Sequence, residues 1–250
     1  METGAIRMFG VHGMGEVRPG DDLAGMIAGA VRASGERIRE NDIFVIAQKA
    51  VSKAEGRIVQ LDSVEPSAMA RRWAEEYGKD ARVVEVILRE TRRVVRMDRG
   101  ILIAETRHGF VCANAGVDNS NAPPGTVVLL PEDPDRSAEL LRERLQAAFG
   151  GRLGVVVSDS FGRPWREGLT NVALGVAGIE PVVDCRGQKD DFGRNLQVTV
   201  IAVADELAGA AELVMGKNRK VPVAVIQGFS YKGEGSGRAL VRAAELDLFR

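Results

Sequence analysis

The stretch RLGVVVSDS, residues 152–160, joins an apolar run directly to a polar one. Three consecutive valines are typical of a strand that is buried on both faces of a sheet. Ligands bind at the carboxyl ends of such strands, because backbone groups and loop side chains converge there. The stretch therefore predicts a central strand of the fold and a candidate site that begins at Ser158, Asp159 and Ser160.

The rest of the chain mixes strand and helix patterns without strict alternation. Apolar runs bounded by polar residues predict strands at 5–11, 42–48, 101–106, 109–113, 196–204 and 221–229. Helices are predicted at 21–34, at 66–91 with a break near Gly78, at 133–150, at 205–216 and from about 237 to the end. The segment GLTNVALGVAGI, residues 168–179, is predicted as a glycine-rich helix packed closely against a neighbour. These elements favour an α+β fold or a complex α/β fold, in a single module over residues 1–250.

Charge and composition exclude several classes of protein. Lys plus Arg number 34 and Asp plus Glu 35, so no net charge attracts nucleic acid or an anionic membrane, and neither is expected as a partner. The N-terminus shows no signal-peptide pattern, and no apolar run approaches the roughly 20 residues that cross a bilayer. A soluble, cytoplasmic protein is therefore expected.

Two cysteines and two histidines limit the metal and redox chemistry that is open to the chain. Cys112 and Cys185 form no CxxC pair, which argues against a zinc site of cysteine and histidine ligands. Two reduced, buried thiols are expected, with a disulfide as the alternative.

Common nucleotide-binding motifs are incomplete in this chain. The cluster Gly13-Met14-Gly15 has Arg18 where a dinucleotide fingerprint needs glycine or alanine, and no Gly-Lys pair completes a P-loop. The basic run RETRRVVRMDR, residues 89–99, has no interleaved aromatic residues that could stack on bases. It is expected to be a solvated helix or sheet edge.

Polar clusters follow four apolar segments. Their chemistry-bearing members are Gln48, Lys49, Ser52, Lys53 and Glu55; Asn114, Asp118, Asn119, Ser120 and Asn121; Ser158, Asp159, Ser160, Arg163 and Arg166; and residues 217–220. Paired aspartates with hydroxyl and carbonyl oxygens suit a hard cation such as Mg²⁺ or Mn²⁺. Lysines can bind phosphate as point charges. In combination, these groups can stabilise a phosphoryl group in transfer.

Each of these residues also has a plainer interpretation. Asp118, beside asparagine and proline, is equally typical of a turn. Asp159 at a strand end is equally typical of a helix cap, and Asn119 and Ser120 are typical turn residues. Lys53 alone is more typical of a solvated surface.

Five segments, taken in order, closely resemble the coenzyme F420 gamma-glutamyl ligase family. They are RPGDDL (18–23), SKAEGR (52–57), VCANAGVDNSN (111–121), SDSFGRPWREG (158–168) and GRNLQVTVIAVADELAGAAELVMGK (193–217). The resemblance spans about residues 8–230. It implies an enzyme that adds L-glutamate to the coenzyme side chain with GTP, using Mg²⁺ or Mn²⁺ and often K⁺. It also implies a two-lobed α+β fold and an intertwined homodimer.

The resemblance further implies roles for individual residues. Asp118 and Asp159 would hold one metal, and Ser160 would contact a second. The implied nucleotide contacts are Met14, Gly15, Glu16, Val17, Gln48, Lys49, Lys53 and Asn121, and a last loop from Met215, Gly216, Lys217 and Asn218 to about residue 222. Some relatives have an acid where Lys217 stands. A charged lysine cannot bind a metal ion, so the second metal is left open, and Lys217 is expected to supply positive charge to phosphate instead.

The reaction that these roles describe runs through an acyl phosphate. GTP would phosphorylate the terminal carboxylate of F420-0 or its dehydro form, and the amine of L-glutamate would displace the phosphate. Arg163 and Arg166 are candidate clamps for a substrate carboxylate, with structural pairing to Glu167 or another acid as the alternative. The competing functions are another nucleotide-dependent amide ligase or phosphotransferase, or a deazaflavin- or nucleotide-binding protein without activity. The general base, the nucleotide preference and the number of glutamates stay open.

Overall fold

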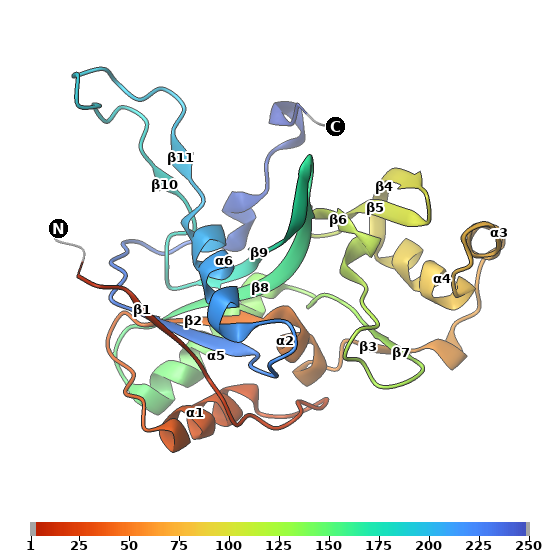
Figure 1. Ribbon diagram of the computed structural model, residues 1–250, viewed down its shortest axis with the longest axis horizontal. Coiled ribbons are helices and arrows are strands. Elements are labelled where there is room, and N and C mark those ends of the chain that lie inside the picture. The colour runs from red at the N-terminus through yellow and green to blue at the C-terminus, as the bar shows by residue number, and fades with distance from the viewer. Residues whose placement is uncertain (1–3, 249–250) are drawn as a thin grey trace.

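The computed structural model describes residues 4–248, and a five-stranded sheet lies at its centre (Figure 1). Its strand order is β1 (Arg7–Gly10), β12 (Val223–Gln227), β2 (Ile43–Ala47), β8 (Gly154–Arg163) and β9 (Arg166–Ala177). Strands β2 and β8 pair in parallel, whereas the other neighbours are antiparallel. Strand β8 has a neighbour on each side, as the three valines predict.

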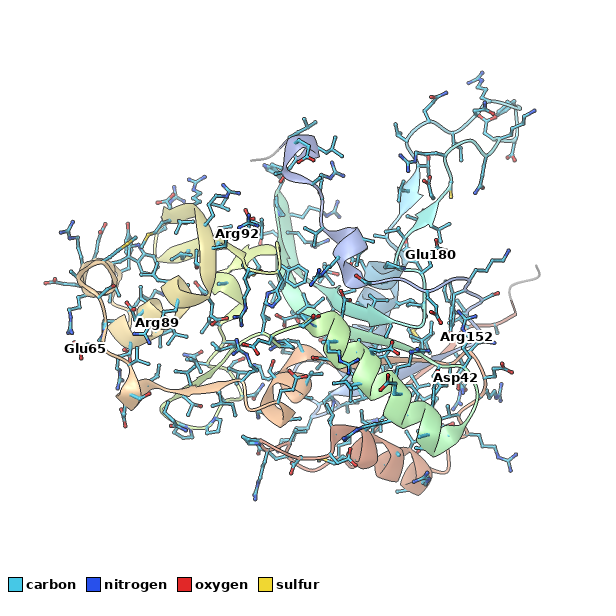
Figure 2. The ribbon with its side chains drawn as sticks, turned by 180° about the vertical axis from the view of Figure 1, so that it is seen from behind. Asp42, Glu65, Arg89, Arg92, Arg152 and Glu180 are labelled. Atoms are coloured by element: carbon cyan, nitrogen blue, oxygen red, sulfur yellow. The ribbon has the colours of Figure 1, made fainter. Side chains whose placement is uncertain are left out.

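Helices cover both faces of this sheet. Helices α1 (Leu23–Ser34) and α5 (Pro134–Phe149) lie on one face, and α6 (Val203–Met215) lies on the other. Figure 1 shows α6 in front of the sheet, and Figure 2 shows α5 and α1 from behind. Val155 and Val157 pack with α1 and α5, while Val156 packs with α6. The alternation of a strand therefore buries all three valines, and together they join the two layers.

A second group of elements has its own buried cluster, around Trp73 and Leu102. It contains helices α3 (Ala68–Tyr77) and α4 (Ala81–Glu90), a sheet of β4 (Thr91–Asp98), β5 (Ile101–Thr106) and β6 (Val111–Ala113), and the pair β3 (Ile58–Gln60) and β7 (Thr126–Val128). The several separate sheets, mostly antiparallel, agree with the α+β expectation.

The basic run of residues 89–99 ends α4 and forms β4, at the edge of the three-stranded sheet. Arg93 lies 2.9 Å from Glu105, and Arg89 lies 3.0 Å from Glu85. Figure 2 shows Arg89 and Arg92 on this outer group of elements. The run is therefore a solvated, acid-paired edge, as expected.

Three predicted elements are wrong. Residues 168–179 form strand β9 and not a helix, because pairing with β8 overrides the weak helical pattern of a segment that also contains valines. The close packing does occur, since a Cβ on Gly175 would lie 2.0 Å from Pro134 O. Only Val200–Ile201 of the strand predicted at 196–204 is extended, as β11 against β10 (Val183–Asp184).

Helix α6 begins at Val203, inside the predicted strand, because Asp205 and Glu206 in its first turn favour a helix start. The helix predicted from 237 onward is also wrong. Up to residue 248 this segment forms only two short 3₁₀ turns, Gly237–Leu240 and Ala244–Leu246. Residues 249–250, which the prediction also covered, lie outside the described residues. Leu240 packs against the core beneath α6, but the later apolar residues do not, and Leu246 is 66% exposed.

Two further expectations concern the state of the cysteines and the absence of a membrane-spanning segment. Cys112 and Cys185 are both free, but only Cys112 is buried, because Cys185 directly follows β10 in the projecting β10–β11 hairpin. No helix in residues 4–248 is long and apolar enough to cross a membrane.

Candidate active site

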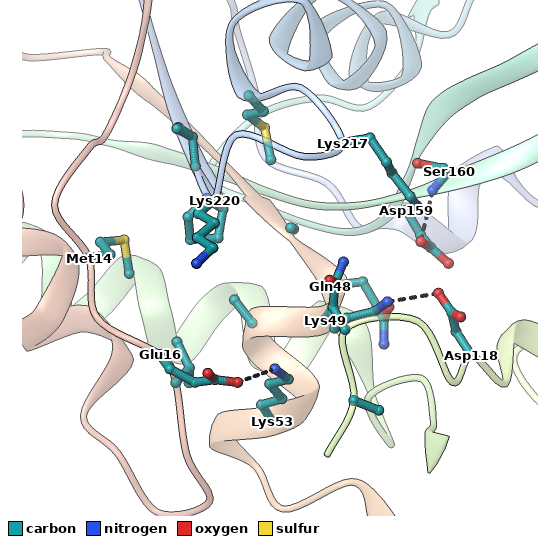
Figure 3. A pocket seen from close by; sticks show the side chains of 18 of the residues that line it. Met14, Glu16, Gln48, Lys49, Lys53, Asp118, Asp159, Ser160, Lys217 and Lys220 are labelled. Atoms are coloured by element: carbon teal, nitrogen blue, oxygen red, sulfur yellow. Dashed lines mark hydrogen bonds and ion pairs between the residues drawn. The ribbon is translucent and has the colours of Figure 1, made fainter. Parts of the chain in front are cut away.

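A cavity of about 980 Å³ opens where β2 and β8 end (Figure 3). Five segments supply most of its lining. They contain every residue named above as a nucleotide or metal contact: Met14, Gly15, Glu16, Val17, Gln48, Lys49, Lys53, Asp118, Asn121, Asp159, Ser160, Met215, Gly216, Lys217 and Asn218. Segments from both ends of the sequence thus meet at the carboxyl ends of two parallel strands, where α/β sheets bind ligands.

The short helix α2 (Gln48–Ala54) begins directly after β2 and delivers two lysines to the cavity. Gln48 fixes its start, since Gln48 Nε2 donates to Leu129 O at 2.9 Å and to Ser52 Oγ at 2.6 Å. Gln48 is only 3% exposed, so its amide needs these partners. Lys49 and Lys53 then lie on the cavity side of α2.

The position of Asp118 is set by its backbone. The Asp118 amide donates to Val128 O at 3.0 Å, and the Val128 amide donates to Asp118 O at 2.9 Å. The turn before it needs Gly116, because φ is +74° there and a Cβ would lie 2.6 Å from a Leu130 carbon. Asp118 is therefore held in place in the wall of the cavity.

The Asp118 carboxylate is already neutralised by hydrogen bonds. Lys49 Nζ lies 2.7 Å from its Oδ2, and the amide and hydroxyl of Ser120 donate to it at 2.7 Å each. Burial would raise the pKa of Asp118, but Lys49 and Ser120 together hold it below its usual range. Ser120 is thus a turn residue, as expected, and it also orients the aspartate.

Asp159 stands opposite, at the end of β8 (Figure 3). Burial raises the pKa of Asp159 to about 6; the amide of Ser160, which donates at 2.8 Å, and the charge of Lys217 oppose that shift, whereas the charge of Asp118 adds to it. Two carboxylates that disfavour each other's ionisation favour a cation between them.

The donor set fits a hard cation that keeps most of its coordination for other ligands. No group of three histidine, cysteine, aspartate or glutamate residues within residues 4–248 could hold a metal. Asp118 and Asp159 supply two carboxylates, and Ser160 adds an oxygen at the same wall. Mg²⁺ is commonly bound by one or two carboxylates together with water and substrate phosphates.

The lysines give the opposite side of the cavity a positive character. Lys53 Nζ lies 3.0 Å from Glu16 Oε1, and its proximity lowers the pKa of that exposed carboxylate. Lys217 and Lys220 also line the cavity. Positive charges that converge on a cavity of this size suit a phosphorylated ligand.

Comparison with known proteins places the chain in a family. A family model described as "F420-0:Gamma-glutamyl ligase" matches residues 13–228. The chain belongs to this family.

Relatives of the F420-0:gamma-glutamyl ligase family match it over nearly their whole length. The Coenzyme F420:L-glutamate ligase of Methanothermobacter thermautotrophicus is 47% identical over 249 residues, which cover 98% of this chain and 99% of that protein. The protein of the same name from Methanopyrus kandleri is 48% identical, covering 94% of each chain. The one from Archaeoglobus fulgidus is 39% identical, covering 98% and 96%. The resemblance carried by the five segments is thereby confirmed.

In this family member, the structure also brings polar residues to the cavity that the sequence analysis missed. Ser158, Asn171 and Glu212 line it as well. Asn171 was hidden because its segment reads as a helix, although a lone asparagine in an apolar strand is itself a signal. Glu212 lies in the last turn of α6, where the helix dipole disfavours an acid. That misplaced charge could have indicated a functional residue.

Arg163 and Arg166 do not line this cavity and lie at the turn between β8 and β9. Arg163 donates to the backbone carbonyls of Glu167 and Gly168 within that turn. These contacts support the structural alternative for Arg163, although the pairing is to the Glu167 backbone and not to its carboxylate. The role of either arginine as a clamp for a substrate carboxylate stays a prediction.

Proposed function

We propose that this protein uses GTP to join L-glutamate to the terminal carboxylate of coenzyme F420-0, or of its dehydro form, through an amide bond. The observation that carries the proposal is the meeting of Asp118 and Asp159 with Lys49 and Lys53 in one large cavity. Family membership and the printed names of the relatives support the acceptor and the amino acid.

An acyl phosphate explains why a ligase needs this cavity. The terminal phosphoryl group of GTP would pass to the substrate carboxylate, leaving GDP. The amine nitrogen of L-glutamate would then bond to the acyl carbon as the carbon–oxygen bond to phosphate breaks, and the amine would lose a proton. Lys49 and Lys53 would stabilise the phosphate charge. The walls would hold the two reactants together, which supplies much of the rate enhancement in such reactions.

Asp118 and Asp159 would hold Mg²⁺ or Mn²⁺, which when bound would neutralise charge on the phosphate oxygens. Lys217 lies close enough to Asp159 for its charge to oppose the rise that burial causes in the pKa of Asp159. This supports a fixed positive charge at this edge of the cavity. We propose that Lys217 serves the phosphate where some relatives are expected to use a second metal, and that K⁺ is a further activator.

We also propose a homodimer. The β10–β11 hairpin projects from the body of the protein (Figure 1), and between its strands it exposes Phe192 by 85% and Val198 by 84%. Apolar side chains on a projecting arm are typical of a segment that packs on another chain. Light scattering coupled to size-exclusion chromatography would test this, and a monomeric mass at micromolar concentration would contradict it.

The function itself is tested by a ligation assay. The purified protein is incubated with GTP, Mg²⁺ or Mn²⁺, L-glutamate and F420-0, and the products are analysed by mass spectrometry. We expect GDP and a mass gain of one or more glutamyl units. Parallel reactions with ATP and with dehydro-F420-0 determine the nucleotide and the acceptor.

The controls separate the competing functions. Asp118→Asn and Asp159→Asn should each abolish turnover while the circular dichroism spectrum stays unchanged. Ligation of a different acceptor carboxylate would instead identify another amide ligase on this scaffold. Tight binding of F420-0 without GDP release would identify a binding protein.

A further inference from the structure

Ser160, Asn171 and Glu212 form a hydrogen-bonded row along one wall of the cavity, and the proposed reaction leaves Asn171 and Glu212 without a role. Ser160 Oγ donates to Asn171 Oδ1 at 2.7 Å, and Asn171 Nδ2 donates to Glu212 Oε2 at 3.1 Å. Ser160 and Asn171 are register partners on β8 and β9, and Glu212 belongs to α6. Three separate elements therefore hold the row in place.

The charge of Glu212 sets the direction of every hydrogen bond in this row. If the Asn171 amide were reversed, its oxygen would face a carboxylate oxygen, which is repulsive. The Asn171 oxygen must therefore face Ser160, and it takes the one proton that the hydroxyl can donate. Ser160 Oγ is left with lone pairs only, and Asn171 engages just one of the two Glu212 oxygens. Apart from the second N–H of Asn171 Nδ2, the row thus offers the cavity only acceptors: the lone pairs of Ser160 Oγ and the other Glu212 oxygen.

A purely structural role does not explain Glu212. It lies in the last turn of α6, where the free carbonyls of the helix repel an acid, whereas Asp205 and Glu206 occupy the favourable first turn. None of the ion pairs within residues 4–248 includes Glu212, although Lys217 lies only five positions away. A partly buried carboxylate without a cationic partner calls for a positive ligand.

A second polar group on the same wall also lacks a partner. Ser158 is 2% exposed, lines the cavity, and its hydroxyl makes no hydrogen bond within the described part of the chain. Ser158 and Ser160 are two positions apart on β8, so both face the α6 side of the sheet. A buried hydroxyl without a partner is unusual, and a ligand at this wall would satisfy it.

We infer that Glu212 and Ser160 form the subsite for the ammonium group of the incoming amino acid. This inference rests on the proposed function, because it takes the cavity to be that of a ligase. An ammonium group has three donors and no acceptor, which complements a wall of acceptors. Ser160 also lies apart from Lys53, which would repel an ammonium group and attract phosphate (Figure 3). Asn171 is the positioning residue, since it acts through Ser160 and Glu212.

The test compares Glu212→Gln with the matched control Glu206→Gln, which removes an exposed acid from the same helix. Each variant is assayed with L-glutamate and, separately, with hydroxylamine, an amine that carries no charge at mildly alkaline pH and traps an acyl phosphate as a hydroxamate. We expect Glu212→Gln to raise the KM for L-glutamate about 10- to 100-fold, the effect of losing a charge-assisted hydrogen bond. Its KM for GTP and its rate of hydroxamate formation should stay near the wild-type values, and Glu212→Asp should restore part of the affinity.

Other outcomes overturn the assignment. An unchanged KM for L-glutamate in Glu212→Gln would remove the subsite, as would an equal loss of hydroxamate formation, which would indicate a structural role. A raised K⁺ requirement with an unchanged KM for L-glutamate would assign the row to K⁺. A wild-type protein that forms neither the glutamyl product nor the hydroxamate would instead contradict the proposed function, and this subsite with it.

Discussion

Lys49 Nζ lies 2.7 Å from Asp118 Oδ2, so a lysine predicted for phosphate is paired with an aspartate predicted for metal. The same Nζ also donates to the hydroxyl of Ser120 at 2.9 Å and to the Ser120 carbonyl oxygen. Lys53 is paired in the same way with Glu16. In the protein without ligands, each lysine thus neutralises an acid. Binding of a metal at Asp118 and of phosphate at the lysines would exchange these partners without leaving a charge unpaired.

Removal of Lys49 should therefore favour the metal. We expect Lys49→Met to tighten Mn²⁺ binding in the absence of nucleotide about fivefold, the equivalent of about 1 kcal/mol for a half-exposed ion pair. Turnover should fall, because a phosphate contact is lost as well. Isothermal titration calorimetry measures the affinity, and Lys79→Met, at an exposed position away from the cavity, is the control. Weaker Mn²⁺ binding in Lys49→Met would show that Lys49 does not compete with the metal.

The pair of Lys53 and Glu16 predicts opposite effects for its two members. Lys53→Met should weaken GTP binding about 10- to 100-fold, because a charge-assisted contact to phosphate is lost. Glu16→Gln should leave GTP binding unchanged or tighter, since the carboxylate 3.0 Å from Lys53 Nζ competes with phosphate. Fluorescence titration with a labelled GTP analogue distinguishes them. Equal losses in both variants would mean that Glu16 is itself needed for nucleotide binding.

Asp159 should make stability depend on pH when no metal is present. Burial raises the pKa of Asp159 to about 6, so the folded protein holds this proton more tightly than the unfolded chain does. The stabilisation is complete below the unfolded-chain pKa of about 4 and is lost as the pH rises through the folded value. Above it, the ionised buried carboxylate costs roughly 3 kcal/mol.

Asp159→Asn removes this cost. In the presence of a chelator, the variant should have a higher free energy of unfolding than the wild type at alkaline pH, and the difference should vanish as the medium becomes acidic. Urea unfolding at both conditions measures it. Added Mn²⁺ should stabilise the wild type and not the variant. A less stable variant at alkaline pH would show that the Asp159 carboxylate is stabilised by partners other than a cation.

Gly175 marks the closest approach of β9 to α5. A Cβ at this position would lie 2.0 Å from Pro134 O and 2.9 Å from Asp135 N, which are both backbone atoms. We expect Gly175→Ala to destabilise the protein by about 3 kcal/mol or more, because neither backbone group can move aside cheaply. Gly162→Ala is the matched control, since nothing lies within 4 Å of its Cβ position on β8. Thermal unfolding followed by circular dichroism compares them, and similar melting temperatures would contradict the prediction.

Local patterns were sufficient for much of the fold. The helix predicted at 21–34 is observed at 23–34, after Asp22, which accepts from the Gly25 amide. The helix predicted at 133–150 is observed at 134–149 and ends at Gly150. The valines of β8 were likewise predicted correctly, because burial on both faces leaves a continuous apolar run. Patterns of this kind depend on residues a few positions apart.

Other parts of the fold and of the site could not be predicted from local sequence patterns. The segment around Asn171 has a glycine-rich composition that fits a helix, and only pairing with β8 makes it a strand. The arginines at 163 and 166 belong to a motif that resembles a site, yet they follow β8 past the cavity into a turn. Chemical type indicated what such residues can do, but their positions depend on partners that are distant in the sequence.

The sequence by itself determined the central strand, the main helices and the polar loops of the candidate site, because these follow from hydrophobic periodicity and from residue chemistry. Only the tertiary structure decided which carboxylates face each other, which lysines they neutralise, and that Ser160, Asn171 and Glu212 form one row. Those relationships join residues 11, 41 and 69 positions apart. They arise from the way that strands and helices pack, and no local pattern encodes such a distance.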